Sequence, residues 1–410
     1  MLRSRLAGLG ELAAGCGADA WLVGGPVRDL LLGRAAPDLD LAVEGPPEAV
    51  ARAIAEELGG RVRKTTDFMT ATVELPGGEE IDIARTRSEC YRDPGALPEV
   101  APAGLVEDLQ RRDFTVNAMA MALAPERFGE LVDPHGGLQD LHARRLRVLH
   151  DASFDDDPTR MLRAARFMLR LGFELEERTA ELMARAAEQR RLAELSGARL
   201  RNELRRIFRR APGEALATLQ RLDLLVAMGL NAATDEAMEA CGRLPEAETP
   251  LGLRLGDRKA TAACLGLYAA FSDERAEGLA ERLMLAADER DTLVAAAELA
   301  AAPPGELAGP VPDSELFFAL RGTSQGAAAA LWTVLDDEQR SRLEHFWRDL
   351  RGTEADISGE DLKAAGHQPG PAFSDALAAA LAAKIDRRAS AEEQLQVALA
   401  MLRSSGRANG

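Results

Sequence analysis

The sequence predicts an α+β protein in which a small N-terminal mixed sheet with helices is followed by a long region of helices alone. Strand-like patterns occur only before about Arg85. The chain has 4% aromatic residues and is rich in Ala, Leu, Arg and Glu, a composition that favours helices over β-sandwiches. Its 410 residues exceed what one core normally holds, so about two to four compact units are expected.

The expected strands are short, β-branched or alternating, and bounded by Gly, Pro or Asp. They are AWLVGG (20–25), DLDLAV (38–43), ATVEL (71–75) and EIDIAR (80–85). A helix is expected from about Val27 to Leu32, opened by a glycine pair and closed by Gly33. Before the first strand, leucines at helical spacing in 2–12 predict a packed amphipathic helix rather than a leader peptide.

Turn-rich segments divide the rest of the chain. Segment 85–104 has the polar, turn-rich composition of a loop, and VDPHGGLQDL (132–141) is expected to end the first domain. Proline-rich breaks follow at 301–313 and 367–373. These breaks suggest a head of about 140 residues followed by helical segments.

Charge is unevenly distributed along the chain. The net charge of −17 argues against loose association with nucleic acid. However, the stretch 105–210 holds 20 arginines against 18 acidic residues, and 198–210 alone has six arginines and one acid. This pattern is typical of a basic site on an acidic protein. A general preference for arginine over lysine, which occurs only four times, is the alternative explanation.

Several classes of protein are not indicated. The four cysteines form no C-x-x-C pair, so neither a zinc ribbon nor a disulfide framework is expected. No apolar run approaches the roughly 18 residues that span a bilayer, and no targeting signal is evident. The five histidines show no ligand spacing, and no nucleophile elbow occurs. We predict a cytoplasmic protein with no membrane association and no obligatory protein partner.

Two aspartates occur one residue apart at the start of the second expected strand. Side chains alternate along a strand, so Asp38 and Asp40 share one face while Leu39 and Leu41 share the other. Two close carboxylates repel each other unless a cation lies between them, and Mg²⁺ commonly takes one or two carboxylates together with substrate phosphates. The alternative is a pair of solvated strand-end residues. Asp82 alternates with two isoleucines on the fourth strand and so faces away from their core side, where an exposed strand residue is the simplest interpretation.

The glycine pair before the expected helix suits a phosphate site. Gly24 and Gly25 let backbone approach a phosphate closely, a helix N-terminus adds favourable partial charge, and Arg28 supplies a guanidinium. A simple tight turn is the alternative for a glycine pair alone. Pro26 is unexpected here, because it removes one amide donor from the turn.

A third group of polar residues lies at 156–167, DDPTRMLRAARF. Asp157 before Pro158 suits a helix cap, which is the simplest interpretation of that aspartate. Arginines then recur every three residues along one side of the helix, where like charges are unfavourable unless an anion or base approaches. A solvated basic face is the alternative. The arginines concerned are Arg160, Arg163 and Arg166.

Taken in series, these motifs resemble a known family. The order GGPVRDLLLG, DLD, RRDFTVNAMA (111–120), VDPHGGLQDL and DDPTRMLRAARF resembles the signature of class II tRNA nucleotidyltransferases and bacterial poly(A) polymerases, a branch of the polymerase-β-like nucleotidyltransferases. The resemblance spans residues 22 to about 208, and ISGEDLKAAGHQPGP in the tail resembles the family weakly. It implies four domains, which are a polymerase-β-like catalytic head (1–142) and an all-α neck (143–210), body (211–340) and tail (341–410).

The resemblance also implies a reaction and its residues. It implies Mg²⁺-dependent, template-independent addition of CCA from CTP and ATP to the 3′ end of tRNA, with release of pyrophosphate and with two Mg²⁺ ions held by Asp38 and Asp40. Related polymerases often have a third carboxylate on a neighbouring strand, and Asp82 is the candidate for it. Asp157 and Arg160 are assigned to the Watson–Crick edge of the base, where a carboxylate and a guanidinium accept cytosine and adenine but repel uracil and guanine. The remaining nucleotide contacts are assigned to Gly25, Arg28, Arg112, Arg163 and Arg166, and those to tRNA to arginines of the neck, Arg199, Arg201 and Arg205.

Alternatives to this function remain open. A poly(A) polymerase commonly carries a basic C-terminal extension, whereas this chain ends in acidic and neutral helices. An enzyme that adds only CC or only A is not distinguished by these motifs. A non-catalytic RNA-binding adaptor with a relict head is disfavoured, because the acidic and arginine motifs are intact. For Arg112, an ordinary surface ion pair with Asp108 or Asp113 is the alternative to nucleotide binding.

Overall fold

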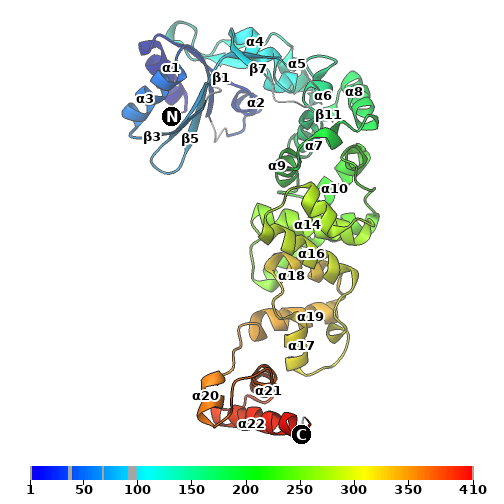
Figure 1. The fold of residues 1–410 in the computed structure, drawn as a ribbon. Helices are drawn as coiled ribbons and strands as arrows, with labels where there is room; N and C mark the ends of the chain where they lie inside the picture. The colour runs from blue at the N-terminus through cyan, green and yellow to red at the C-terminus, as the bar shows by residue number, and fades with distance from the viewer. Residues whose placement is uncertain (1, 36–38, 67–68, 91–98, 409–410) are drawn as a thin grey trace. The chain divides into compact units, whose positions relative to one another are not determined.

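The computed structural model describes residues 2–35, 39–66, 69–90 and 99–408. Its internal contacts divide the chain into two compact units, residues 1–203 with 218–230, and residues 204–217 with 231–410 (Figure 1). Helices α9 (Gly197–Ile207) and α10 (Pro212–Arg221) each contribute residues to both units. The three boundaries between the four predicted domains stay predictions, and α9 lies within the predicted neck.

A seven-stranded mixed sheet forms the centre of the first unit. The strand order is β3-β4-β5-β2-β1-β8-β9, in which β2 and β5 are parallel and every other neighbouring pair is antiparallel. The strands are β1 (Asp19–Val23), β2 (Leu39–Glu44), β3 (Arg61–Thr66), β4 (Thr70–Glu74), β5 (Glu80–Arg85), β8 (Ala120–Ala122) and β9 (Leu131–Val132). The pairs β6 (Arg87–Cys90) with β7 (Glu99–Pro102) and β10 (Arg145–Leu146) with β11 (Glu174–Leu175) form two further two-stranded sheets.

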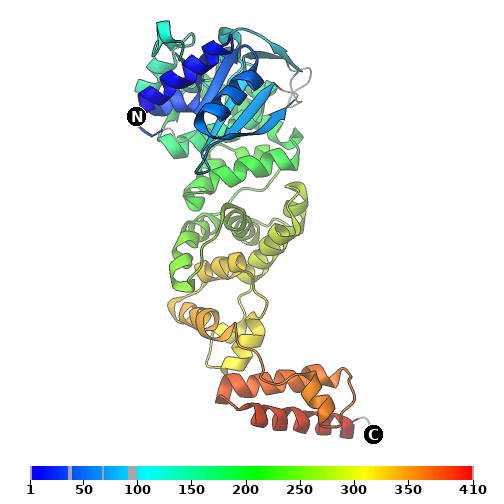
Figure 2. The ribbon, with the colours of Figure 1, turned by 90° about the vertical axis from the view of Figure 1, so that its left-hand side faces the viewer.

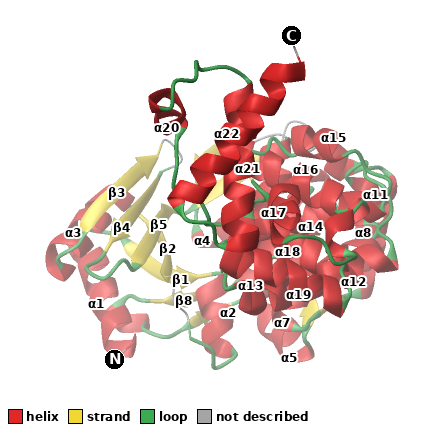
Figure 3. Ribbon diagram, turned by 90° about the horizontal axis from the view of Figure 1, so that it is seen from below, coloured by secondary structure: helices red, strands yellow, loops and turns green. Residues whose placement is uncertain are grey.

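The two faces of the main sheet differ in chemistry. On one face, residues such as Leu41 and Ile83 are paired in register and almost fully buried. That face is covered by α1 (Leu2–Gly15) and α3 (Pro47–Leu58), whereas α2 (Gly25–Leu31) and α4 (Leu105–Gln110) lie on the opposite side (Figures 1 and 3). Because side chains alternate, Asp40 and Asp82 face that opposite side. The sheet therefore separates a hydrophobic core from a polar surface.

The four predicted strands and both N-terminal helices are confirmed, with boundaries within about two residues. The expectation that strands end near Arg85 is wrong, because six strands, β6 to β11, follow β5 along the chain. These strands have two to four residues, too few for an alternating pattern to be visible. Strand β3, RVRKTT, was also missed, since it is a charged edge strand, a composition that protects sheet edges from pairing.

Within the segment expected to be a loop, 85–104, the described residues form the antiparallel strand pair β6 and β7 instead.

The remaining elements of the first unit are helices. The helices of this unit that follow α4 are η1 (Thr115–Asn117), η2 (Pro125–Arg127), α5 (Gly137–Ala143), α6 (Ser153–Asp156), α7 (Thr159–Leu171), α8 (Glu177–Glu188), η3 (Arg191–Glu194) and α11 (Leu224–Ala227).

The second unit is helical throughout its described residues. Its longest helices end the chain, where α21 and α22 run side by side (Figure 2). The elements are α12 (Asp235–Arg243), η4 (Leu244–Ala247), α13 (Glu248–Leu251), α14 (Asp257–Phe271), α15 (Ala276–Arg282), α16 (Ala287–Ala301), η5 (Gly305–Leu307), α17 (Asp313–Leu320), α18 (Gln325–Val334), α19 (Asp337–His345), the π-turn η6 (Phe346–Leu350), α20 (Gly359–Ala364), α21 (Ala372–Arg387) and α22 (Ala391–Ala408).

Local sequence explains where several of these helices start. Asp336 and Gln339 form a reciprocal capping box before α19, and the proline-rich breaks coincide with the connections before α17 and α21.

Cys241 of α12 and Cys264 of α14 are buried free thiols whose sulfur atoms lie 2.9 Å apart. Their spacing of 23 residues gave no indication of this contact. No helix in the described part of the chain has the length and apolar character needed to cross a bilayer.

Helix α1 offers a test of the packing on the buried face of the sheet. A Cβ atom on Gly10 would lie 1.9 Å from the carbonyl oxygen of Leu123, whereas one on Gly8 would meet nothing within 4 Å. We expect Gly10→Ala to lower the free energy of unfolding by about 1–3 kcal/mol through overpacking. Gly8→Ala, in the same helix, should raise it by about 0.5–1 kcal/mol. Urea denaturation followed by circular dichroism measures both, and equal stability of the two variants would contradict this packing.

Candidate nucleotide-binding and catalytic site

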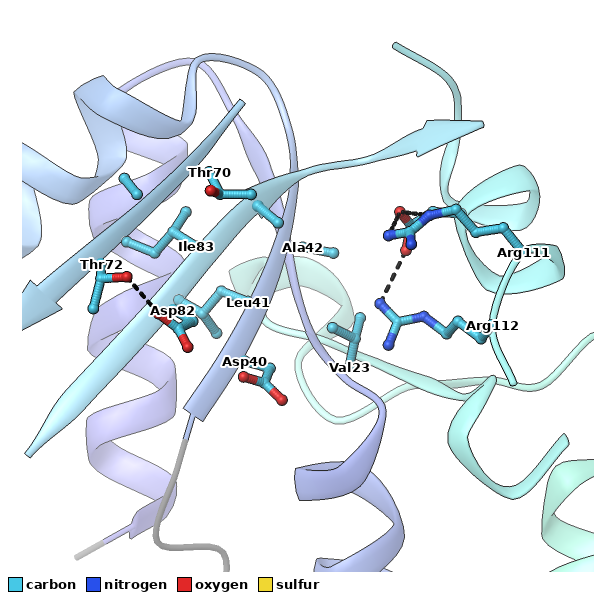
Figure 4. A pocket seen from close by; sticks show the side chains of 13 residues that line it. Val23, Asp40, Leu41, Ala42, Thr70, Thr72, Asp82, Ile83, Arg111 and Arg112 are labelled. Atoms are coloured by element: carbon cyan, nitrogen blue, oxygen red, sulfur yellow. Dashed lines mark hydrogen bonds and ion pairs between the residues drawn. The ribbon is translucent and has the colours of Figure 1, made fainter. Parts of the chain in front are cut away.

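A cavity of about 330 Å³ opens on the polar face of the sheet. Its floor is formed by β2, β4 and β5, and its wall by the end of α4 and the two residues that follow it (Figure 4). The polar side chains that line it are Asp40, Thr70, Thr72, Asp82, Asp108, Arg111 and Arg112. Three carboxylates and two guanidinium groups thus surround one opening.

The two carboxylates at the floor lie side by side. Asp40 and Asp82 are paired in register on the parallel strands β2 and β5, and both line the cavity (Figure 4). Thr72, which is in register with Asp82 on β4, donates its hydroxyl to Asp82 Oδ1 at 2.6 Å. This bond orients the Asp82 carboxylate. Asp38 lies outside the described residues, so its position beside Asp40 stays a prediction.

The described carboxylates suit a hard divalent cation. Mg²⁺ takes one or two protein carboxylates and completes its shell with water and phosphate oxygens, which matches the oxygen donors of Asp40 and Asp82. Within the described ranges, no group of three or more His, Cys, Asp or Glu side chains is arranged to hold a metal ion. The described residues therefore supply Asp40 and the candidate third carboxylate, Asp82, whereas the other predicted metal ligand, Asp38, lies outside them.

The glycine turn lies against Arg112. Gly24 has φ 72°, a conformation that glycine adopts without strain, and a Cβ there would lie 2.7 Å from Arg112 Nη1. The N–H of Gly24 donates to the Met119 carbonyl, so this amide is already used within the sheet. Gly25 is the first residue of α2, and Pro26 follows it. The turn thus allows close approach of the Arg112 guanidinium rather than offering the Gly24 amide.

Arg111 and Arg112 share one buried carboxylate. Arg111 donates to Asp108 Oδ1 at 2.7 Å, and Arg112 donates to Asp108 Oδ2 at 2.9 Å. Burial acts to raise the pKa of Asp108, but the charges of Arg112 and Arg111 outweigh it and hold the pKa below its ordinary value. The ion pair considered for Arg112 therefore exists, and it forms part of the cavity wall. It positions the guanidinium there without preventing contact with a ligand.

Arg28 does not line the cavity. Its side chain is 2% exposed, and it donates to Asp29 and, at 2.5 Å, to Asn117 Oδ1. Its guanidinium also lies 5.2 Å from the centre of the Phe167 ring. Burial lowers the pKa of Arg28, and the neighbouring Asp29 opposes that shift. Direct contact with phosphate stays a prediction, whereas these contacts favour a role in positioning α2.

Asp113 joins the head motif to helix α7. It accepts two hydrogen bonds from Arg163 and one from Asn117 at 2.9 Å. Burial acts to raise the pKa of Asp113, but the charge of Arg163 and these hydrogen bonds hold it below its ordinary value. The same pairing raises the pKa of Arg163. Arg163 is therefore anchored to the head rather than free on a solvated face.

The residues predicted to recognise the base of the incoming nucleotide, Asp157 and Arg160, lie at the start of α7. Asp157 accepts the N–H of Thr159, so the cap suggested by the sequence is present, and it also pairs with Arg199. Arg160 is 3% exposed and donates to the Arg111 carbonyl at 2.7 Å. Arg166 lies 3.4 Å from Glu203. Asp157 and Arg160 are thus close in the chain but have separate partners.

The three arginines predicted to bind RNA have different surroundings. Arg199 contacts Asp157 at 2.6 Å, and Arg201 is half-buried on the same helix. Arg205 belongs to the second unit, where it pairs with the buried carboxylate of Glu289. Their contacts with RNA stay predictions.

Some residues of the site were missed by the sequence analysis. Arg111, Asp113 and Asn117 all lie in the motif RRDFTVN, of which only Arg112 was chosen. Thr70 and Thr72 were missed because a threonine on a strand is unremarkable. The alternation that selected Asp82 would also have selected Thr72, had the pairing of β4 with β5 been known.

The fold and this cavity define a polymerase-β-like nucleotidyltransferase head followed by helices. Residues 20–147 match the family described as "Poly A polymerase head domain", and residues 172–228 match "Probable RNA and SrmB- binding site of polymerase A". A solved structure described as "The structure of CCA-adding enzyme apo form II" is 33% identical, with a TM-score of 0.83 over 97% of this chain and 95% of that one. The chain belongs to the superfamily of class II tRNA nucleotidyltransferases and bacterial poly(A) polymerases.

Two further comparisons agree with this membership. The Thermotoga maritima CCA-adding enzyme complexed with tRNA is 31% identical, with a TM-score of 0.76 over 97% of this chain and 95% of that one. An A-adding tRNA nucleotidyltransferase from Geobacter sulfurreducens is 34% identical over 97% of this chain and 47% of its own length. The chain spans about half the length, or less, of the first curated relatives that it matches.

The ion pair of Asp113 with Arg163 makes a stability prediction. Asp113→Asn leaves the buried part of Arg163 without its counter-charge, so we expect the free energy of unfolding at pH 7 to fall by about 3–5 kcal/mol. Because the folded pKa of Asp113 is lowered, its contribution is present above pH 4 and is lost as the pH falls through that lowered value.

Urea denaturation between pH 3 and pH 7 measures this effect. The difference between wild type and Asp113→Asn should shrink toward acid pH. Asp151→Asn is the control, since Asp151 pairs with Arg178 at the surface and its loss should change stability little. If the free energy of unfolding of Asp113→Asn at pH 7 equalled that of wild type, the proposed importance of this ion pair would be contradicted.

Proposed function

We propose that the protein is an enzyme that adds nucleotides to the 3′ end of tRNA without a template and releases pyrophosphate. One observation carries the proposal: Asp40 and Asp82 lie in register on parallel strands at the floor of a cavity whose wall holds Arg111 and Arg112. Carboxylates for a cation, next to guanidinium groups for a triphosphate, suit nucleotidyl transfer. Family membership supports the same chemistry.

The side chains of the cavity have distinct proposed roles. Asp40 and Asp82, together with Asp38, would hold Mg²⁺, whose charge stabilises the triphosphate and the attacking RNA hydroxyl. Thr72 orients Asp82, and Asp108 orients Arg111 and Arg112 toward the triphosphate. The RNA 3′-hydroxyl attacks the α-phosphate in line, and pyrophosphate leaves. Gly24 allows Arg112 to reach this position.

Selection of the nucleotide is assigned to the start of α7. The Asp157 carboxylate accepts the exocyclic amine of cytosine or adenine, and a guanidinium donates to the neighbouring ring acceptor. Uracil and guanine present a carbonyl where the carboxylate needs a donor. CTP and ATP are therefore the proposed substrates. The bond between Arg160 and the Arg111 carbonyl links this recognition site to the cavity wall.

The product is the complete CCA end in our first proposal. The fold neighbours described as CCA-adding enzymes support it over almost the whole chain. A second candidate is the addition of the terminal A alone, which is favoured by the name of the Geobacter sulfurreducens relative that matches 97% of this chain. The tRNAs that each activity extends differ, so one experiment separates the two.

Purified protein should be incubated with tRNAs that lack CCA, CA or A, with CTP and ATP offered separately and together. A CCA-adding enzyme extends all three tRNAs to full length when both nucleotides are present. An A-adding enzyme extends only the tRNA that lacks A. Denaturing gels that resolve single nucleotides measure the products, and long homopolymers with ATP would indicate poly(A) synthesis instead.

Substitution of the floor carboxylates tests the mechanism. We expect Asp40→Asn and Asp82→Asn each to lower kcat at least about 100-fold, because a cation ligand is lost. Thr72→Val, which removes only the hydroxyl that orients Asp82, should lower kcat about 10-fold or more, and Thr72→Ser should restore it. Single-turnover extension of tRNA measures these rates.

The same variants test the adaptor alternative. RNA binding should be unchanged in Asp40→Asn, so a gel-shift assay serves as the control for folding. If Asp40→Asn extended tRNA at the wild-type rate, the metal-dependent mechanism would be wrong. If wild type bound RNA but extended none of the tRNAs, the protein would be an adaptor.

A further inference from the structure

The two oxygen atoms of the Asp157 carboxylate have different surroundings. Oδ1 accepts the backbone N–H of Thr159 at 3.1 Å, the Thr159 hydroxyl at 2.7 Å and Arg199 Nη2 at 2.6 Å. Among the described residues, Oδ2 takes part in none of the hydrogen bonds found for this carboxylate. A carboxylate oxygen accepts about two hydrogen bonds, so Oδ1 is saturated and Oδ2 is the acceptor that is left.

The three donors to Oδ1 have different origins. Both Thr159 bonds are local, since Thr159 is the first residue of α7 and caps form between neighbours. Such a cap is satisfied equally well by either oxygen of a carboxylate. Arg199 comes from α9, 42 residues further along the chain, and its bond carries a full positive charge. Arg199 therefore adds the contact from outside α7 that holds Oδ1. The Asp157 side chain as a whole is 22% exposed.

We propose that Arg199 is a specificity-determining residue of the nucleotide site, which positions Asp157 so that Oδ2 accepts the exocyclic amine of the incoming base. This inference rests on the proposed function of Asp157 in base recognition. Arg199 would then orient the Asp157 carboxylate. The sequence analysis had instead predicted that Arg199 contacts tRNA. Arg199 is thus a positioning residue and not a catalytic one.

The consequence is an effect on selectivity rather than on overall affinity. When Arg199 is removed, the carboxylate is held by the local cap alone, and the amine contact made by Oδ2 weakens. CTP and ATP lose that contact. UTP and GTP never make it, because they present a carbonyl at that position. The preference for CTP over UTP and for ATP over GTP should therefore fall.

The test compares three substitutions on the same helix. Arg199→Met removes the charge and the donors but keeps the length of the side chain, and Arg199→Lys keeps the charge with a different geometry. Arg206→Met removes the same charge from an exposed position of α9 and is the control. Thermal unfolding of each variant checks that the fold is intact.

The measurement is kcat/KM for CTP against UTP on a tRNA that lacks CCA, and for ATP against GTP on a tRNA that lacks A. We expect Arg199→Met to lower these ratios by about 10- to 100-fold, the range for a hydrogen bond to a charged group. Arg199→Lys should recover part of the ratio, and Arg206→Met should keep the wild-type ratio. The KM for tRNA should be the same in all of them.

Two results would overturn the inference. If Arg199→Met raised the KM for tRNA equally with either nucleotide and left the ratios unchanged, Arg199 would contact RNA instead. If Arg206→Met lowered the ratios as much as Arg199→Met, the effect would come from net charge.

Equilibrium binding without RNA separates this inference from the proposed function. Titration calorimetry with CTP and UTP should show a wild-type preference for CTP that Arg199→Met loses. If wild type extended no tRNA, the proposed function would fail, but this binding preference would still decide the role of Arg199. A preference for CTP that is equal in wild type and Arg199→Met, or absent from wild type, would contradict the inference.

Discussion

A chain of charged and polar side chains, buried in its middle and ending in two partly exposed arginines, is the constraint on which the first unit depends. It begins and ends on α7, where two arginines seven residues apart, or two helical turns, face the head. Buried charges are costly unless each has a partner, so every member holds its neighbours in place. Removing one member leaves another charge unpaired in the interior. The chain runs through Arg163, Asp113, Asn117, Arg28, Asp29 and Arg170.

This constraint places the two ends of the proposed nucleotide site relative to each other. Helix α7 starts beside Asp157, and α2 starts at the glycine turn that adjoins Arg112. Because the same charges tie α7 to α2, the group proposed to contact the base and the wall proposed to contact the triphosphate belong to one rigid frame. Phe167 of α7 adds to this frame through an edge-to-face contact with Phe114 at 5.9 Å. Precise spacing of this kind is what selection of a nucleotide without a template requires.

The arginines of the chain therefore have two kinds of role. Many that the sequence places in ligand motifs are paired with acids in the structure, as Arg163 is with Asp113 and Arg205 with Glu289. Such pairs explain how a basic stretch persists in a protein with a net charge of −17. Arg111 and Arg112 differ, since they share Asp108 and still line the cavity. Position on the cavity wall, and not residue type, distinguishes the arginines proposed to bind ligand from those held in buried ion pairs.

The sequence by itself determined four of the strands, the two N-terminal helices and the buried faces of β2 and β5. Alternation along β2 and β5 put Asp40 and Asp82 opposite the buried leucines and isoleucines, and the motif order identified the family, because both depend on neighbours in the chain. Only the tertiary structure decided which elements meet. The register that brings Asp82 beside Asp40, the pairing of Thr72 with Asp82 and the contact of Arg199 with Asp157 all join residues 10 or more positions apart. Local periodicity sets the direction of a side chain, whereas its partner depends on how distant segments pack, which no local pattern records.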